Sequence, residues 1–437
     1  MAVQTGSTRR SFLKAAAGAT ALGTLIVPKS VHAGAGETLR VGLVGCGGRG
    51  NSAAIDALKA DPHAQLVAVA DTFADRAADG LALIKGDASI ADRVVVQPDR
   101  VFTGFDGYKQ LIDSGVDVVL LATPPHFRPE HLRYAVAAGK HTFVEKPVAV
   151  DAPGVKSVMD SCRQAQEKGL AVVSGLCWRY HLGMRETIRR ILEDKAIGDI
   201  VAIESSYNAG GLWHRGDKPE WSRMEYQIRN WLYHTWLSGD HILEQAVHSL
   251  DKTAWLLGDV QPVQATALGG RQQRIDPMYG NVYDHFTVFY EYPGGQRVYF
   301  TCRQQDNCST RIEELVHGTQ GRAELVREQL MDLAGKRIWK YRGPKPSFYQ
   351  QEHDELFAGI RKGEPINNGH YMCNSTMIGL LGRMAAYTGQ TVTWDQCEGS
   401  IERLGPTEYA WGDAPVQAVA IPGKTALAMN ENLLDRR

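Results

Sequence analysis

Apolar runs alternate with helix-type stretches along the first half of the chain. Residues 39–44 and 65–70 are short and almost wholly apolar, and residues 52–59, between them, have helix-compatible spacing. Two more apolar runs follow at residues 117–122 and 141–144, each preceded by helix-type sequence. Strands that alternate with helices in this way form a parallel sheet. The pattern therefore predicts an α/β domain built on such a sheet.

The pattern changes near residue 176, where the α/β domain is predicted to end. A helix at residues 155–168 and a strand at 170–174 complete that domain, which spans residues 38–176. Closely spaced strands with turn signals between them indicate an antiparallel sheet, and such segments follow at residues 201–207, 263–268, 284–292, 296–303, 312–316 and 321–326. We therefore expect an α+β domain with a predominantly antiparallel open sheet at residues 177–395, helices at 351–362 and 373–389, and an extended tail at 396–437.

The first 33 residues have a pattern of their own. Arg9 and Arg10 begin the run RRSFLK, a small-residue apolar stretch continues to Val27, and a cleavage-type sequence ends near Ala33. These features are those of a secretory signal, and the paired arginines resemble the twin-arginine type. Since no other stretch reaches about 18 apolar residues, we expect no membrane span. The pattern predicts a substrate of the twin-arginine export machinery and a periplasmic or otherwise exported mature protein.

Composition and charge narrow the class of protein. The chain has 437 residues, of which 43% are hydrophobic, with 48 basic and 49 acidic side chains. This is enough apolar material for two or three domains. The chain lacks the clustered cations that hold a nucleic-acid backbone, so we expect no nucleic-acid partner. Loss of residues 1–33 would remove four basic residues and no acidic one, which leaves 404 residues with a net charge of −5.

Seven cysteines are scattered along the chain without a CxxC pair. That spacing gives no support for a zinc site built on cysteine. An oxidising compartment allows disulfides, although this spacing does not require any. If one forms, we expect it between Cys302 and Cys308.

A glycine-rich sequence follows the first apolar run directly. Gly45, Gly47 and Gly50 form a GxGxxG pattern between a predicted strand and a predicted helix. The first glycine allows a tight turn, the second lets the backbone approach a pyrophosphate at the helix N-terminus, and the third lets helix and strand pack closely. Asp71 ends the second predicted strand, 26 residues after Gly45. A carboxylate there binds a ribose 2′-hydroxyl and repels a 2′-phosphate, which predicts NAD rather than NADP.

Two later strand ends carry further polar motifs. Thr123-Pro124-Pro125-His126 follows one predicted strand, and Glu145-Lys146-Pro147 follows the next. Residues just beyond the C-terminal ends of parallel strands face the ligand crevice. The expected cofactor contacts are therefore Gly45, Gly47, Gly48, Arg49, Gly50, Asp71, Thr123, Pro124, His126, Glu145 and Lys146.

GxGxxG, ATPPHFRPEH and AGKHTFVEKP at these spacings resemble the Gfo/Idh/MocA oxidoreductases, the family of glucose-fructose oxidoreductase and inositol 2-dehydrogenase. The resemblance implies a Rossmann domain followed by an open sheet that supplies the substrate wall and often the oligomer face, hence a homodimer or homotetramer. It also implies that Lys146 lies near nicotinamide and substrate; the alternative is a solvated surface lysine. Residues just after the last Rossmann strand are expected to enter the crevice, with Arg179 contacting the cofactor and Trp178 and Tyr180 the substrate.

One predicted helix, at residues 238–254, carries the catalytic candidates. Asp240, Glu244, His248 and Asp251 are spaced 4, 4 and 3 residues apart along it, which places them on one face. A carboxylate one turn from a histidine can fix its tautomer and raise its basicity, as a general base requires. The predicted catalytic residues are therefore Lys146, Glu244 and His248, and Asp240 joins them in substrate binding.

The family pattern at this helix is DxGxH, and Glu244 stands where that pattern has Asp. The longer acid could orient His248, bind a substrate hydroxyl, or do neither. Glu244 and His248, with Asp240 and His241 nearby, could also hold a metal, but hydride transfer to NAD needs none and no convincing third ligand is evident, so no metal is predicted. Asp251 is interpreted as part of a solvated face.

Residues 205–241 hold four of the nine tryptophans, Trp213, Trp221, Trp231 and Trp236. Aromatic faces stack on the apolar faces of pyranose rings, while neighbouring polar groups bind hydroxyls. A saccharide pocket that includes Trp236 is therefore one interpretation of this excess. Packing in a domain core or a subunit contact is the other.

Together the motifs predict an NAD-dependent oxidoreductase that acts on a secondary hydroxyl of a sugar, glycoside or cyclitol. There is little free NAD outside the cytoplasm, so an exported enzyme of this kind needs a tightly held cofactor that is recycled in place. Two alternatives stay open. One is an NAD-dependent glycoside hydrolase or lyase that oxidises the sugar transiently, and the other is a non-catalytic sugar- or nucleotide-binding protein.

Overall fold

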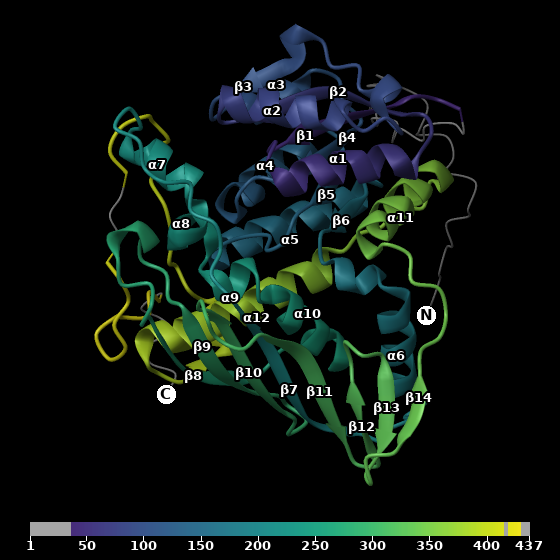
Figure 1. Cartoon of the computed structure of the whole chain (residues 1–437), viewed down its shortest axis with the longest axis vertical. Helices are drawn as coiled ribbons and strands as arrows, with labels where there is room; N and C mark the ends of the chain where they lie inside the picture. The colour runs from purple at the N-terminus through teal and green to yellow at the C-terminus, as the bar shows by residue number, and fades with distance from the viewer. Residues whose placement is uncertain (1–35, 415–417, 430–437) are drawn as a thin grey trace, which may run out of the picture.

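The computed structural model describes residues 36–414 and 418–429, which form two layered units (Figure 1). A parallel sheet between two helix layers makes the first unit, drawn purple to blue, and a larger sheet makes the second. The predicted twin-arginine signal at residues 1–33 lies outside the described residues. Within the described part of the chain, no helix has the length and apolar character needed to span a membrane.

The first sheet has six parallel strands in the order β3-β2-β1-β4-β5-β6. The five strands predicted for this domain are all present, each within two residues of its expected bounds, and the short β3 is an addition. The bounds are β1 Leu39–Val44, β2 Ala64–Asp71, β3 Val101–Thr103, β4 Val118–Leu121, β5 His141–Val144 and β6 Val172–Ser174.

Apart from the edge strand β3, these strands are buried on both faces, which explains their continuous apolar sequences. In β1, Leu39, Val41 and Leu43 belong to one hydrophobic cluster, whereas Val44 belongs to another. Successive side chains leave a strand on opposite faces, so one six-residue run serves both helix layers. The first cluster includes residues of α1 (Gly48–Ala60) and α2 (Ala74–Lys85), and the second includes residues of α3 (Gly107–Asp113), α4 (Arg128–Ala137) and α5 (Ala152–Glu167).

The second sheet has nine strands in the order β14-β13-β12-β11-β7-β10-β9-β8-β15. Its neighbouring pairs are antiparallel except for β7 and β10, which confirms the predominantly antiparallel prediction. The bounds are β7 Ile200–Ala209, β8 Gln264–Gly270, β9 His285–Glu291, β10 Arg297–Gln304, β11 Arg311–Gly318, β12 Gly321–Glu324, β13 Gln329–Asp332, β14 Arg337–Lys340 and β15 Val392–Thr393.

Helices cover one face of this second sheet. Below the first domain in Figure 1, α10 (Val247–Leu256) and α12 (Gly369–Thr388) pack on that face, and α12 also contacts α5. The opposite face exposes Leu268, Phe289 and Tyr299. The remaining helices are α6 Leu182–Leu192, α7 Arg223–Arg229, α8 Thr235–Ser238, α9 His241–Glu244, α11 Phe348–Lys362, which packs on α1, and α13 Trp394–Glu398.

The single helix predicted at residues 238–254 is wrong, because the structure breaks it into α9 and α10. The first break lies at Asp240, which precedes α9 with φ of +72°. Its carboxylate accepts hydrogen bonds from the backbone N–H of His241 and of Tyr283. A second break follows α9, where the N–H of Ala246 donates to the carbonyl of His241, five residues earlier. The two breaks turn the four polar residues of this stretch in different directions.

The tail is largely irregular, as expected. Beyond α13, the described residues form no helix or longer strand, only a single bridge between Ser400 and Met429. Part of the tail, drawn yellow in Figure 1, runs back beside α7. The Cys302–Cys308 disulfide that the sequence allowed is not formed: all seven cysteines are free, with Cys302 buried in the inner face of β10 and Cys308 in the loop beyond it.

Candidate active site

The glycine loop joins β1 to the N-terminus of α1. Gly45 has φ of +100°, and a Cβ there would lie 2.7 Å from the carbonyl carbon of Ala122. A Cβ on Gly50 would lie 1.9 Å from the carbonyl oxygen of Gly45. By contrast, a Cβ on Gly47 or Gly48 would meet no atom within 4 Å. The protein's own packing therefore requires two of the glycines, while the other two leave open space at an uncapped helix N-terminus.

That open space belongs to a cavity of about 330 Å³. It fits a dinucleotide pyrophosphate, because the free backbone N–H groups at the start of α1 are suited to bind an anion. Asp71, Thr123 and Pro124 line it, as predicted from their strand ends. Arg49 and the glycines of the loop complete the predicted part of the lining. The sequence did not assign the remaining residues to the cofactor: Thr72, Phe73, Arg76 and Ala122 and, from the second domain, Trp213, Arg215, Ile228, Arg229 and Trp231.

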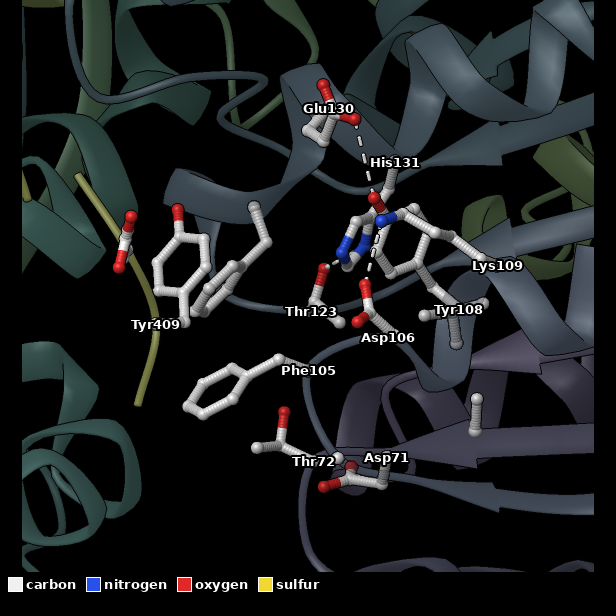
Figure 2. A pocket seen from close by; sticks show the side chains of 15 residues that line it. Asp71, Thr72, Phe105, Asp106, Tyr108, Lys109, Thr123, Glu130, His131 and Tyr409 are labelled. Carbon is white, nitrogen blue, oxygen red and sulfur yellow. Dashed lines mark hydrogen bonds and ion pairs between the residues drawn. The ribbon is translucent and has the colours of Figure 1, made fainter. Parts of the chain in front are cut away.

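Asp71 lies between this cavity and a second one of about 410 Å³, shown in Figure 2. Its two carboxylate oxygens accept hydrogen bonds from the N–H of Cys46, at 2.8 Å, and of Phe73, at 3.0 Å. Burial raises the pKa of Asp71, and these two N–H groups oppose that shift. The backbone bonds hold the carboxylate at the end of β2, where a ribose hydroxyl can reach it.

Arg49 lies in the glycine loop's helix, but its guanidinium turns into the protein. Its Nε donates to Glu145 at 2.5 Å, and Nη2 donates to Glu352 of α11 at the same distance. Burial raises the pKa of Glu352 well above its ordinary value. Glu145 also accepts the N–H of Lys146 at 3.1 Å. Arg49 and Glu145, both predicted cofactor contacts, thus tie α1, α11 and the end of β5 together and orient the backbone at Lys146.

Lys146 and Glu244 come together from the two domains. The Nζ of Lys146 donates to the main-chain carbonyl of Glu244 at 2.6 Å and lies 3.9 Å from its carboxylate oxygen Oε1. Both side chains are largely buried, with 15% of each exposed. The other carboxylate oxygen of Glu244, Oε2, is buried and has no hydrogen-bond partner among the described residues.

His248 lies in the first turn of α10, next to this pair. Its pKa lies well below the ordinary value, chiefly because of burial and then because of the positive charges of Lys146, Lys252 and Arg49. The imidazole is therefore neutral at physiological pH. In the described part of the chain its buried Nδ1 has no hydrogen-bond partner. Two buried polar atoms beside a lysine are thus left for a ligand to satisfy.

The polar residues at either end of the predicted helix are placed elsewhere. Asp240 is fully buried, and besides its two backbone bonds it accepts the hydroxyl of Tyr387. Asp251 is also buried rather than solvated, because Arg179 donates to it at 2.9 Å and Arg179 pairs with Asp259 as well. This placement favours structural roles for Asp240, Asp251 and Arg179 over contacts with substrate or cofactor.

The three predicted aromatic substrate contacts also pack inside the protein. Trp178 stacks on Phe348, with ring centroids 4.9 Å apart. The hydroxyl of Tyr180 donates to Asn368, and Nε1 of Trp236 donates to Gln227. Core packing, the alternative interpretation given for Trp236, describes all three rings best, and the expected entry of Trp178 and Tyr180 into the crevice is wrong.

Two further polar side chains approach the Lys146–Glu244 pair from neighbouring strands. Burial, together with the Glu244 carboxylate, raises the pKa of Tyr207 to about 12. Gln304 donates to Gln245 at 2.5 Å, next to Glu244 in the chain. The C-terminal ends of β7 and β10, which run parallel, bring these groups to the site. Both residues lie at the ends of predicted strands, which could have indicated a place in the site. Only the parallel pairing of β7 with β10 shows that these two strand ends lie side by side.

The metal alternative gains no support from the arrangement of ligands. Glu244 lies beside Lys146, and Asp240 is committed to Tyr283, His241 and Tyr387. Among the described residues, no group of three or more His, Cys, Asp or Glu side chains is arranged to hold a metal ion.

Comparison with known proteins gives two family matches. The model described as "Oxidoreductase family, NAD-binding Rossmann fold" matches residues 39–174, and the "GFO/IDH/MocA C-terminal domain" matches residues 186–324. The chain is 28% identical over 248 residues to 2,7-anhydro-N-acetylneuraminate hydratase of Escherichia coli, covering 57% of this chain and 60% of that protein. It is 23% identical over 275 residues to a pig (Sus scrofa) trans-1,2-dihydrobenzene-1,2-diol dehydrogenase, covering 62% and 70%.

Solved structures share the fold over most of the chain. Aldose-aldose oxidoreductase from Caulobacter crescentus, complexed with glycerol, superimposes with a TM-score of 0.63 at 19% identity, covering 82% of this chain and 100% of that one. GenD2 from gentamicin A biosynthesis, in complex with NAD, gives 0.62 at 18% identity, covering 82% and 96%. The two family matches together take in more than half of the chain, with all of the first sheet and strands β7 to β12 of the second, and the protein therefore belongs to the Gfo/Idh/MocA oxidoreductase family.

Proposed function

We propose that this protein is an NAD-dependent oxidoreductase that acts on a secondary hydroxyl of a sugar, glycoside or cyclitol. The observation that carries the proposal is the convergence of Lys146, Glu244 and His248, with two unpartnered buried atoms, close to Arg49, which lines the dinucleotide cleft. The relatives named above include a dehydrogenase of a cyclic diol and an aldose oxidoreductase, which supports this substrate class.

The chain's own groups divide the work of the reaction. When bound, NAD supplies the acceptor for the hydride that leaves the carbinol carbon. His248 is neutral and can take the proton of the substrate hydroxyl on a ring nitrogen. Lys146 carries a positive charge that stabilises the negative charge developing on that oxygen, in a site shielded from water. The free Oε2 of Glu244 can accept a hydrogen bond from a neighbouring hydroxyl, which orients the ring.

We further propose that the precursor is exported through its twin-arginine segment and works with a tightly held cofactor. Such an enzyme must return the hydride to a second substrate in place. The name of the aldose-aldose oxidoreductase describes a redox exchange between two sugars, which suits this requirement. Mass and absorbance of whatever small molecule co-purifies with the chain would test cofactor retention directly, and a preparation free of nicotinamide nucleotide would count against it.

The activity test uses a panel of sugars, glycosides and cyclitols. Reduction of NAD is followed by the absorbance of reduced nicotinamide, first with free and then with enzyme-bound cofactor, and sugar products are identified by mass. We expect at least one carbinol to be oxidised. Failure of every compound, in a protein shown to bind NAD, would favour a non-catalytic binding protein.

Glycoside cleavage by transient oxidation remains the second candidate. A glycosyl hydrolase family 109 protein from Streptomyces niveus is 31% identical, but over 209 residues that cover 47% of this chain and 38% of that protein. A chromogenic glycoside in the same panel separates the two functions. Release of the aglycone without net reduced cofactor would establish cleavage, and a keto-sugar with the aglycone still attached would establish oxidation.

A further inference from the structure

The tail contributes one wall of the cavity in Figure 2. We propose that residues 402–414, here called the C-terminal strap, bind the adenosine half of the dinucleotide and restrict its exit. The inference rests on the proposed function, since it takes the ligand of this cleft to be NAD. Glu408 and Tyr409 of the strap line the cavity, opposite Asp71 and Thr72 at the end of β2.

The strap is attached firmly at its first residues. Arg383 of α12, fully buried, donates to Glu402 at 2.8 Å and to the carbonyl of Val150 at 2.7 Å. Two residues further on, the N–H of Leu404 donates to the carboxylate of Asp151, which caps α5. The strap therefore starts from a fixed point on the helices that join the two domains.

Its far end is attached to a different element. The carbonyl of Gly412 accepts the N–H of Met224, at the start of α7, at 3.0 Å. Ala414 packs against the hydrophobic cluster that contains Met224 and Ile228. Ile228 and its neighbour Arg229 also line the pyrophosphate cavity. Both ends of the strap are thus held, and the segment between them spans the side of the nucleotide cleft.

Aromatic side chains form the middle of the strap. Tyr409 stacks on Phe105 of the β3–α3 loop, with ring centroids 5.4 Å apart, and its hydroxyl lies 2.7 Å from Nε2 of His126. Trp411 packs on Phe105 at 4.7 Å and on Phe73 at 5.6 Å. Tyr409 and Trp411 nevertheless remain 41% and 49% exposed. Contacts with one exposed side can separate at much lower cost than buried ones, so the middle can lift while the ends stay attached.

The cavity has the features of an adenosine site. Asp71, held by two backbone N–H groups, is placed to bind the ribose. Beyond it, the rings of Phe105, Phe127 and Tyr409 offer apolar faces to a purine base. In Figure 2, Tyr409 lies away from Asp71, with Phe105 between them, so the strap closes the end where the base would lie. A base seated there can leave only after the strap moves.

Release of the nucleotide measures the strap directly. Purified full chain is loaded with labelled NAD and mixed with a large excess of unlabelled NAD. The dissociation rate constant is then recorded for wild type and for the double variant Tyr409→Ala/Trp411→Ala. We expect the double variant to release NAD at least about tenfold faster, because lost contacts of a bound state act mainly on dissociation. Ile421→Ala, an exposed apolar residue in the same tail but outside the strap, is the matched control and should keep the wild-type rate.

A second measurement needs no variant. Hydrogen exchange of residues 402–414 is followed in the wild-type protein under three conditions: without ligand, with AMP, and with nicotinamide mononucleotide. We expect AMP to slow exchange across the strap and nicotinamide mononucleotide to leave it unchanged. Unchanged exchange with AMP, or an unaltered release rate in the double variant, would overturn the strap while leaving NAD binding intact. Failure of wild type to bind NAD at all would instead overturn the proposed function.

Discussion

At the scale of single residues, the catalytic assignment depends on the protonation state of His248. Its imidazole is buried, and the positive charges of Lys146, Lys252 and Arg49 all act against protonation, so its pKa lies well below 6.5. Lys146 needs its charge and His248 needs to be without one. The positive charge of Lys146 beside His248 opposes protonation of the imidazole, so the lysine helps to keep the base neutral.

This arrangement predicts a characteristic pH dependence. A histidine with a lowered pKa stays neutral as the pH falls through 6.5 and gains a proton only below that, so oxidation should hold its rate through 6.5 and decline at more acidic pH. The His248→Ala variant should be slower by about 10²–10⁴-fold. The pH–rate profile of wild type checks the first statement, and a decline centred at or above pH 6.5 would argue against His248 as the base.

Arg179 and Asp251 lead to a prediction about stability instead of catalysis. The pair is buried, and Asp251 also accepts the hydroxyl of Ser375 at 2.8 Å. Removing one charge of a buried pair leaves the other uncompensated, which costs about 3–5 kcal/mol. Arg179→Met, which leaves the buried Asp251 carboxylate without its cation, should therefore lower the free energy of unfolding in urea by an amount of that order, whereas Lys195→Met, in the exposed pair with Asp199, should change it by less than about 1 kcal/mol. Equal effects of the two variants would contradict the assignment.

At the scale of elements, the break between α9 and α10 places the site. If residues 238–254 formed one helix, Asp240, Glu244, His248 and Asp251 would share a face. The breaks separate them: Glu244 and His248 face Lys146, while Asp240 and Asp251 face the interior. The apolar stripe continues across the break, which is why periodicity alone indicated one helix. Asp240 is held by Tyr283 and Tyr387. These two partners are distant from Asp240 in the sequence, so the sequence pattern could not reveal them.

Asp240 is accordingly predicted to act as a positioning residue. Asp240→Ala would leave the N–H of Tyr283 and of His241 without their partner, at a cost of about 1–3 kcal/mol for each buried group. We expect lower thermal stability together with a lower kcat and little change in NAD affinity, since the glycine loop is remote in the chain. Asp240→Asn keeps the shape of the side chain and one hydrogen-bond acceptor, so it should recover part of the thermal stability and part of kcat. Loss of NAD binding in Asp240→Ala would show a wider structural role.

Five of the six strands of the first domain, all but the edge strand β3, were the easiest elements to predict. Each is a short apolar run buried on both faces, and its chemistry lies at the strand end, so Asp71, Thr123 and Lys146 could be placed from sequence. The residues that close the cleft, Arg215 and Tyr409, come from segments with no such regularity. Their positions follow from contacts between domains, which the pattern of apolar positions along the chain does not encode.

At the scale of the whole molecule, the outer face of the second sheet exposes apolar side chains within the described part of the chain. Phe289 and Tyr299 are opposite each other on β9 and β10, with ring centroids 5.8 Å apart, and Leu268 is exposed on β8. Apolar side chains gathered on one sheet face are typical of an association surface. We propose that the chain forms a homodimer or homotetramer through this face.

Light scattering after size-exclusion chromatography tests the assembly. Wild type should elute as a dimer or tetramer, and Phe289→Glu/Tyr299→Glu should shift the mass toward the monomer, because two charges would be buried in the interface. Leu333→Glu, at an exposed apolar residue elsewhere on the surface, should leave the mass unchanged. A monomeric wild type would contradict the proposal.

Transfer of the hydride to bound nicotinamide, in a single turnover, tests the central claim most directly. A carbinol that the panel identifies as substrate is prepared with deuterium at the reacting carbon and mixed with NAD-loaded protein. The account predicts that wild type moves the deuterium to the nicotinamide, while Lys146→Met and His248→Ala, shown to bind NAD as wild type does, transfer it at least about a hundredfold more slowly. The control His63→Ala, at an exposed histidine, should match wild type. Unimpaired transfer by both site variants would contradict the account.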